Sequence, residues 1–356
     1  MTRTEVLFEV RGRLGLITLN RPDVVNALTA GMARAMLDTL RAWAADDSIT
    51  QVLVTGAGNR GLCAGGDIVA IYSDLADGGG ATAEFWAMEY RLNALINNYP
   101  KPYIAFMDGL VLGGGVGISA HGSHRIVTER TRTGMPETTI GFVPDVGGTH
   151  LLSRSPGQTG IHAALTGAHL GGAEALYLGL ADFHVHSDRL GELAWLLESE
   201  PVGGIMGRFA SPAPESFLFA QRAWIDEAYA QEDLERILAR LADFGARGIA
   251  AAAEAGETIG GKSPTALKVT LESLRRARGL SSLEATLEQE YRVGLRFLDT
   301  PDFREGIRAQ VIDKDRQPVW NPSTLHAVGR DTVDGYFAPL GARELDLSDI
   351  STATHE

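Results

Sequence analysis

Two glycine-rich segments lie where an expected strand meets an expected helix. The first is Cys63-Ala64-Gly65-Gly66-Asp67, and the second is Gly113-Gly114-Gly115-Val116-Gly117. Glycine lets the backbone approach a ligand closely, and the first turn of a helix leaves N–H groups without partners. Two such groups converging from separate loops form an oxyanion hole, the stabiliser used in acyl-transfer and enolate chemistry. Tight packing and a phosphate cradle are the alternatives, although no Lys-Ser/Thr pair follows either segment as it does in a P-loop.

Three acidic residues are candidates for proton transfer or nucleophilic attack. Glu137 and Asp145 lie in one otherwise apolar stretch, each beside Pro or Gly residues. Two carboxyl groups in such surroundings acquire different pKa values, so one can act as an acid and the other as a base or nucleophile. A helix N-cap is the alternative role for Asp145. Glu89 is the third candidate, and its spacing alone favours the surface of a helix.

The spacing of the metal-ligating residue types predicts no metal site. The histidines form no His-Glu-x-x-His or comparable motif. The single cysteine, Cys63, excludes an intramolecular disulfide and a Cys-rich zinc or iron–sulfur site. Because no histidine is near it in the sequence, packing is favoured over a nucleophilic role. We expect neither a metal nor a redox cofactor.

The composition of the 356-residue chain is that of an ordinary globular protein, with 44% hydrophobic and 22% charged residues. Its net charge of −13 argues against nucleic-acid binding, because no basic stripe is present to neutralise phosphates. No apolar run approaches the ~20 residues that span a bilayer, and the N-terminal stretch has no secretory apolar core. We therefore expect a cytoplasmic protein with no membrane partner.

Hydrophobic periodicity predicts the elements that hold these segments. Residues 6–19 are typical of a β-hairpin, 32–43 of an amphipathic helix and 85–98 of a second helix. Short apolar strands are expected at 51–55, 103–107 and 124–128. Strands alternating with crossover helices indicate an α/β sheet.

The second half of the chain is expected to be mainly helical. We divide the sequence into a core over 1–204, a helical region over 205–337 that packs on the core, and a loosely ordered tail over 338–356. A Pro- and Gly-rich linker or domain-edge loop is expected at 201–214. Ser263-Pro264 is typical of a helix start, with serine as the cap and proline in the first turn.

In order and spacing, the motifs over residues 5–190 resemble the crotonase (enoyl-CoA hydratase/isomerase) superfamily. Besides the glycine-rich segments, the matching stretches are Leu19-Asn20-Arg21-Pro22, Asn26-Ala27-Leu28 and Met135-Pro136-Glu137 through Pro144–Gly148. The resemblance implies a spiral of ββα units followed by a helical C-terminal region. It also implies an acyl-CoA substrate, with coenzyme A present only as part of that substrate, and an oxyanion hole formed by the N–H groups of Gly66 and Gly114. The superfamily often forms trimers or hexamers, so a homo-oligomer is one expectation, and C-terminal helices folded back on their own chain are the other.

The acidic residues decide which branch of the superfamily the chain resembles. An enoyl-CoA hydratase has one catalytic glutamate two residues after its glycine triplet, where this chain has Gly117, and another where Glu137 stands. Dienoyl-CoA isomerases also need an acid at the Gly117 position. The chain instead resembles the 3-hydroxyisobutyryl-CoA hydrolase branch, which hydrolyses a short branched 3-hydroxyacyl-CoA thioester in valine catabolism.

The resemblance to this branch extends over nearly the whole chain. Further matching stretches are Glu89-Tyr90, Ser263-Pro264, Asp302–Gly306, Ile312–Asp315 and Pro318-x-Trp320. It implies that Glu137 attacks the carbonyl or activates water, that Asp145 holds the 3-hydroxyl group or shares the proton transfer, and that Glu89 and Gly114 contact the substrate. A hydratase or isomerase acting with Glu137 alone and a non-catalytic acyl-CoA-binding protein are the alternatives.

Overall fold

A computed structural model describes residues 4–351, and its two sheets confirm the α/β class. The larger sheet has the strand order β1-β2-β3-β5-β7-β9, and the smaller has the order β4-β6-β8. The larger sheet contains β1 (Val6–Arg11), β2 (Leu14–Leu19), β3 (Gln51–Gly56), β5 (Tyr103–Met107), β7 (His124–Val127) and β9 (Phe183–His184). The smaller contains β4 (Gly61–Cys63), β6 (Leu110–Leu112) and β8 (Arg132–Gly134). The predicted hairpin pairs β1 with β2 antiparallel, whereas the other neighbouring strands are parallel.

Helices form most of the remaining chain. Up to the middle of the chain they are α1 (Ala30–Ala44), α2 (Ile68–Leu75), α3 (Gly80–Asn97), α4 (Gly114–Gly117), α5 (Gly148–Ser153), α6 (Thr159–Thr166), α7 (Gly172–Leu178), α8 (Leu190–Leu197) and α9 (Val202–Phe209). After an extended segment over 210–216 come α10 (Phe217–Tyr229), α11 (Leu234–Ala246), α12 (Ala250–Gly260), α13 (Pro264–Ala277), α14 (Leu283–Phe297), α15 (Pro301–Ile307), α16 (Arg330–Gly335) and α17 (Ser348–Ser351). Short helical turns include η2 (Glu137–Ile140) and the π-helix η4 (Arg308–Ile312).

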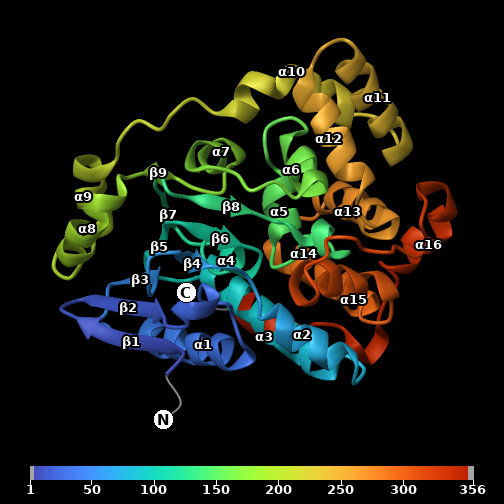
Figure 1. Cartoon of the computed structure of the whole chain (residues 1–356). Helices are drawn as coiled ribbons and strands as arrows, with labels where there is room; N and C mark the ends of the chain where they lie inside the picture. Colours follow the sequence, from blue (N-terminus) through green and yellow to red (C-terminus); the bar gives the residue numbers. More distant parts are fainter. Residues whose placement is uncertain (1–3, 352–356) are drawn as a thin grey trace.

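The chain passes repeatedly from the larger sheet to the smaller sheet and then into a helix. β3 leads to β4 and α2, β5 leads to β6 and α4, and β7 leads to β8 and η2 (Figure 1). This is the spiral of ββα units that the motifs implied. Because strands of the smaller sheet are parallel neighbours, the turns that follow them lie at one edge of that sheet. Gly66, Gly114 and Glu137 each belong to one of these turns.

Different helices cover the two faces of the larger sheet. Val52 and Val54 pack in the main core with α1 and α3, whereas the intervening Leu53 packs against α8 and α9. Successive side chains of a strand point to opposite faces, which accounts for the alternation. Helix α9 is a difference from the expected linker, and the predicted boundary at residue 204 falls inside it. Its apolar face, with Ile205 and Phe209, is buried on the sheet.

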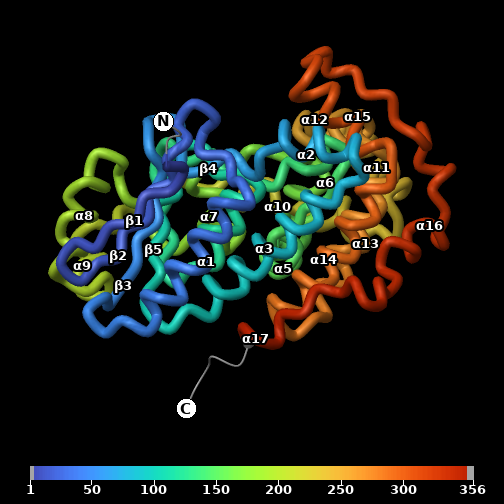
Figure 2. The backbone as a smooth tube through the Cα atoms, turned by 90° about the horizontal axis from the view of Figure 1, so that it is seen from below, coloured from blue at the N-terminus to red at the C-terminus, as the bar shows by residue number. Residues whose placement is uncertain are grey.

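The helices after residue 216 lie on the opposite side of the core from α8 and α9 (Figures 1 and 2). α13 contacts α5 and α6, and α14 contacts α3 and α5. The predicted cap of α13 is confirmed, since Ser263 Oγ accepts a hydrogen bond from Ala266 N at 3.1 Å.

The expectation of a loosely ordered tail from 338 is wrong for the part of it that the structure describes. Leu345, Leu347 and Ile350 are buried in the main core, and α17 contacts α3. Arg292 Nε also donates to Glu344 at 2.7 Å. Apolar side chains that complete the core therefore hold residues 338–350 in place, whereas 352–356 lie outside the described residues.

Asn26 connects the loop after β2 to the segment that delivers Gly66. Its φ of 56° lies in the left-handed region, which asparagine tolerates better than most residues, and its side chain is fully buried. Its Oδ1 accepts a hydrogen bond from Arg21 N at 2.9 Å. Its Nδ2 donates at 3.1–3.2 Å to three backbone carbonyls, those of Ala57, Gly61 and Leu62. The side chain therefore fixes the entry into β4.

Asn26→Ala should destabilise the fold, because it leaves several buried backbone groups without their partner. We expect the free energy of unfolding, measured by urea denaturation, to fall by about 2–4 kcal/mol. The control Asn59→Ala, at an exposed position nearby, should change it by less than about 0.5 kcal/mol. Similar losses in the two variants would contradict the role of Asn26.

Candidate active site

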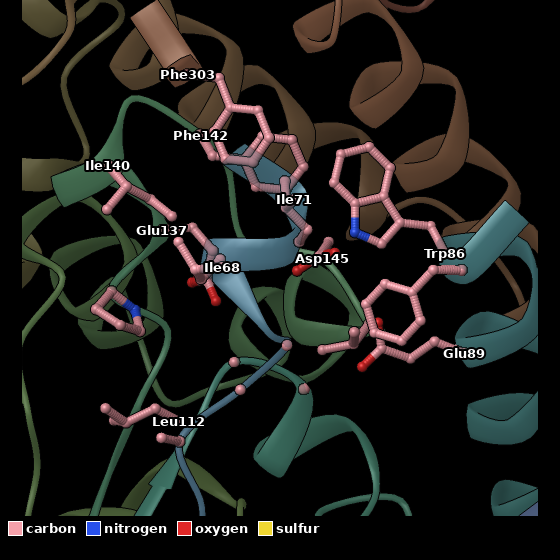
Figure 3. A pocket seen from close by; sticks show the side chains of 18 of the residues that line it. Ile68, Ile71, Trp86, Glu89, Leu112, Glu137, Ile140, Phe142, Asp145 and Phe303 are labelled. Atoms are coloured by element: carbon pink, nitrogen blue, oxygen red, sulfur yellow. The ribbon is translucent and has the colours of Figure 1, made fainter. Parts of the chain in front are cut away.

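The core and the C-terminal helices enclose an apolar pocket with a volume of about 200 Å³. All of the residues predicted for the site line it, namely Gly66, Glu89, Gly114, Glu137 and Asp145. The side chains of Ile68, Ile71, Leu112 and Ile140 contribute to its apolar surface (Figure 3). The structure thus brings together segments that are up to 79 residues apart in the sequence, from Gly66 to Asp145.

Backbone N–H groups of the two glycine-rich segments lie next to each other at the pocket. Leu28 forms a parallel bridge beside Gly66 by donating to Gly65 O and accepting from Asp67 N. These bonds leave the Gly66 N–H outside the bridge. Gly114 is the first residue of α4, so its N–H has no acceptor within that helix. A Cβ at Gly114 would lie 3.4 Å from Gly66 N, which places the two groups side by side.

Helix α3 approaches α4 closely, and glycine makes this approach possible. A Cβ at Gly114 would clash with Glu89 Oε1. A Cβ at Gly117 would lie 2.7 Å from Val146 Cβ and 2.9 Å from Asn93 Nδ2. Glu89 and Asn93 are four residues apart and therefore face α4 together. Val146 and Asn93 thus fill the space at Gly117, where a hydratase would carry an acid.

The three carboxyl groups face one another across the pocket. Glu89 and Glu137 enter from opposite sides, with Asp145 between them (Figure 3), and each is less than a tenth exposed. The surface position favoured for Glu89 on spacing alone is therefore wrong. Among residues 4–351, Glu89 Oε1 and Glu137 Oε2 have no hydrogen-bond partner. Both atoms are buried, without a hydrogen-bond donor in this part of the chain, at residues that line the pocket.

Burial changes the protonation of these groups. It raises the pKa of Glu89 and that of Glu137 well above the usual range, and the charge of Asp145 raises both further. Burial also raises the pKa of Asp145 to about 7, although the hydrogen bond from Tyr90 acts in the opposite direction. A pocket of this kind holds carboxyl groups in both neutral and ionised forms near neutral pH.

Asp145 is not the helix cap that its sequence context allowed. Helix α5 begins at Gly148, and the capping position is Gly147, which has no side chain. The Oδ2 atom of Asp145 instead accepts a hydrogen bond from the Tyr90 hydroxyl group at 2.7 Å. Sequence reasoning missed this partner, because nothing in the spacing of residues 90 and 145 indicates that they meet.

Stacked aromatic rings form one wall of the pocket, which we call the aromatic wall, made of Trp86, Phe142 and Phe303. The ring centroids of Trp86 and Phe142 are 5.1 Å apart, and those of Phe142 and Phe303 are 4.6 Å apart. The rings come from α3, from the segment after η2 and from α15 (Figure 3). No sequence pattern marked Trp86 or Phe303 as a pocket residue, because each looks like an ordinary core residue of its helix.

Cys63 is the first residue of the first glycine-rich segment and is fully buried. Burial raises the pKa of its thiol to about 12, so the nucleophilic thiolate is not formed near neutral pH. Its Sγ accepts a hydrogen bond from Gly65 N at 3.4 Å.

Within 4–351, no three residues among His, Cys, Asp and Glu are grouped so that they could hold a metal ion. No helix in this part of the chain has both the length and the apolar character to cross a membrane.

A family model and curated relatives both match nearly the whole chain. The enoyl-CoA hydratase/isomerase family model matches residues 14–337. The chain is 38% identical over 355 residues to "3-hydroxyisobutyryl-CoA hydrolase, mitochondrial" of Danio rerio, covering 97% of this chain and 92% of the relative. It is 35% identical over 352 residues to the protein of the same name in Homo sapiens, covering 96% and 90%.

Two solved structures are similar over almost the whole chain. A carnitinyl-CoA dehydratase from Mycobacterium thermoresistibile is 50% identical, with a TM-score of 0.93 and coverage of 97% of this chain and 99% of that one. An enoyl-CoA hydratase from Rhodobacter sphaeroides 2.4.1 is 40% identical, with a TM-score of 0.90 and coverage of 96% and 100%. The chain therefore belongs to the enoyl-CoA hydratase/isomerase (crotonase) superfamily of acyl-CoA enzymes, and it has the crotonase fold that its motifs predicted.

Proposed function

We propose that the protein hydrolyses a short branched 3-hydroxyacyl-CoA thioester, with 3-hydroxyisobutyryl-CoA as the substrate to test first. The observation that carries the proposal is the set of three buried carboxyl groups beside the N–H groups of Gly66 and Gly114, with no acid at Gly117. The similarity to hydrolases of this name over nearly the whole chain supports the choice of substrate.

The N–H groups of Gly66 and Gly114 would bind the thioester oxygen. Each donor stabilises the negative charge that develops on this oxygen, and loss of one such donor costs ~10²–10³ in rate. Glu137 then acts in one of two ways. Its carboxylate attacks the carbonyl carbon and the C–S bond breaks, giving a mixed anhydride that water hydrolyses, or it takes a proton from a water molecule that attacks directly. In both routes the products are free coenzyme A and the hydroxy acid.

Asp145 and Glu89 would orient the acyl group. Asp145, with its pKa raised to about 7, can accept a hydrogen bond from the substrate's 3-hydroxyl group or share the proton transfer. The raised pKa of Glu89 favours its neutral form, which can donate a hydrogen bond from inside an apolar pocket. The aromatic wall would limit the length of the acyl chain.

Dehydration or hydration is the second candidate reaction, because the 50%-identical structure bears the name of a carnitinyl-CoA dehydratase. In this reaction a carboxylate such as Glu137 removes the α-proton, and a neutral carboxyl group protonates the departing 3-hydroxyl group. A non-catalytic acyl-CoA-binding protein is the third candidate. The space at Gly117, filled by Val146 and Asn93, favours hydrolysis over the two-glutamate hydratase mechanism.

One assay distinguishes the three candidates. The protein is mixed separately with 3-hydroxyisobutyryl-CoA and with crotonyl-CoA, and free thiol and enoyl absorbance are followed. Thiol release from the first compound supports the hydrolase. Loss of enoyl absorbance from the second, or its gain from the first, supports the hydratase or dehydratase. Binding without either change supports the non-catalytic protein.

Cellular location and assembly stay predictions. The sequence favours the cytoplasm, whereas the hydrolases of Danio rerio and Homo sapiens are named as mitochondrial. Light scattering on the purified protein would measure whether it forms a homo-oligomer.

Glu137→Gln should reduce thiol release by about 10³-fold, because it removes the nucleophile or base. Binding of 3-hydroxyisobutyryl-CoA, measured by calorimetry, should weaken little, since the oxyanion donors and the aromatic wall are unchanged. The control Glu84→Gln, at an exposed position on α3, should release thiol at the same rate as the wild type. Undiminished turnover by Glu137→Gln would contradict the mechanism.

Asp145→Asn should shift the pH profile of kcat/KM. Asp145 raises the pKa of Glu137 through its negative charge, and Glu89 and Glu290 contribute in the same direction. Without the Asp145 charge, the pKa of Glu137 falls, so the limb on which activity rises with pH moves to lower pH.

The same variant should lose about tenfold more activity on 3-hydroxyisobutyryl-CoA than on isobutyryl-CoA, because a hydrogen bond from the 3-hydroxyl group to a charged acceptor is lost. Initial rates on both esters measure this difference. Equal losses on the two esters, with an unmoved pH limb, would remove both proposed effects of Asp145.

A further inference from the structure

Glu290 is a buried carboxyl group that the proposed mechanism does not use. It lies on α14, is 2% exposed and does not line the pocket. It accepts three hydrogen bonds, from Gly147 N at 2.7 Å, from Thr149 N at 2.9 Å and from Thr149 Oγ1 at 2.5 Å. The donors belong to Gly147, in the turn that follows Asp145, and to Thr149, in the first turn of α5. A side chain of the C-terminal helices therefore holds a turn of the active-site core.

This turn has an unfavourable backbone conformation. Val146 has a φ of 51° and Gly147 a φ of 80°. A β-branched residue rarely adopts the left-handed region, and such a residue costs about 1–3 kcal/mol and persists only where its surroundings fix it. The surroundings here are Glu290 on one side and His121, whose Nε2 lies 2.8 Å from Val146 O.

Asp145 immediately precedes the strained residue, so the geometry of the turn determines where its carboxyl group points. We propose that Glu290 is a positioning residue, which holds the turn over 146–149 and thereby sets the place of Asp145 in the pocket. The proposal rests on the proposed function in one respect, namely that Asp145 contacts the substrate. It adds a residue from the C-terminal helices to the groups on which turnover depends.

A purely structural role is the alternative, because a carboxylate at the N-terminus of α5 would also stabilise that helix. Gln289 provides a matched control for this alternative. It is the neighbouring residue on α14, it is also buried, and its Nε2 donates to Ser273 O at 3.2 Å on another helix. Gln289→Met therefore breaks a buried hydrogen bond of α14 without touching the turn.

The first measurement needs no turnover. In the full-length protein, Glu290→Gln should increase amide hydrogen exchange in the peptide that covers residues 142–150, because Gly147 N–H and Thr149 N–H donate to different carboxyl oxygens and the NH2 group of glutamine can replace neither as an acceptor. Gln289→Met should leave exchange in this peptide as in the wild type. Unchanged exchange in Glu290→Gln would overturn the proposal.

The second measurement is a double-mutant cycle with Asp145→Asn, with kcat and KM measured on the pH plateau so that changes in the pKa of Glu137 do not contribute. Glu290→Gln alone should lower kcat on 3-hydroxyisobutyryl-CoA by about 10-fold to 100-fold, the cost of misplacing a group by up to ~1 Å. In the Asp145→Asn background the same substitution should cost less than about threefold. An equal loss in both backgrounds, or the same loss in Gln289→Met, would overturn the proposal.

Two further measurements cover a variant that does not fold and a wild type that releases no thiol. If Glu290→Gln does not fold, Thr149→Val removes one of the three donors, and it should lower kcat by a smaller factor that again vanishes with Asp145→Asn. If the wild type releases no thiol, the proposed function fails, and the cycle is run on the binding of 3-hydroxyisobutyryl-CoA relative to isobutyryl-CoA. A preference for the hydroxylated ester that survives Glu290→Gln unchanged would then overturn the positioning role.

Discussion

The burial of several carboxyl groups in and behind the wall of one apolar pocket is the constraint on which the rest of this structure depends. A buried carboxylate without partners is strongly unfavourable, and neighbouring carboxylates repel one another. The protein meets this constraint unevenly, because Asp145 has a hydroxyl donor and Glu290 has three donors, whereas Glu89 Oε1 and Glu137 Oε2 have none within residues 4–351. The two groups with donors are fixed by hydrogen bonds, and each of the other two has a buried oxygen without a donor in the described part of the chain.

The residues that line the site could be predicted from the sequence, whereas the residues that hold them in position could not. Glu137, Asp145 and the two glycine-rich segments carry local signals, such as glycine at a strand end or an acid between Pro and Gly residues. Glu290 carries a weaker one: it follows Leu287 by three residues and precedes Gly294 by four, on a face that is otherwise buried. A charged residue on such a face indicates a buried partner, but it does not say which one. That choice depends on the packing of α14 against α5, which no spacing in the sequence encodes.

The differences in the fold have a related cause. Three of the eight residues of α9 are glycines, which disfavour a helix, so local propensity predicted a linker there. The helix forms because its four apolar side chains, Val202, Ile205, Met206 and Phe209, are buried on the larger sheet. The position of residues 338–350 near the end of the chain likewise predicts a loose tail, whereas the burial of Leu345, Leu347 and Ile350 in the core orders this segment. In both segments, burial against a distant part of the chain outweighs local preference.

The aromatic wall has a consequence for how such an enzyme diversifies. Its rings come from three separate segments, and Phe303 belongs to α15, more than 150 residues after the last of the pocket acids. Changes in a ring would alter the volume offered to the acyl chain while the carboxyl groups and glycine amides stay where they are. In the proposed reaction, the exchange of a single ring would therefore change which acyl chains fit, while the groups proposed to break the thioester bond stay the same.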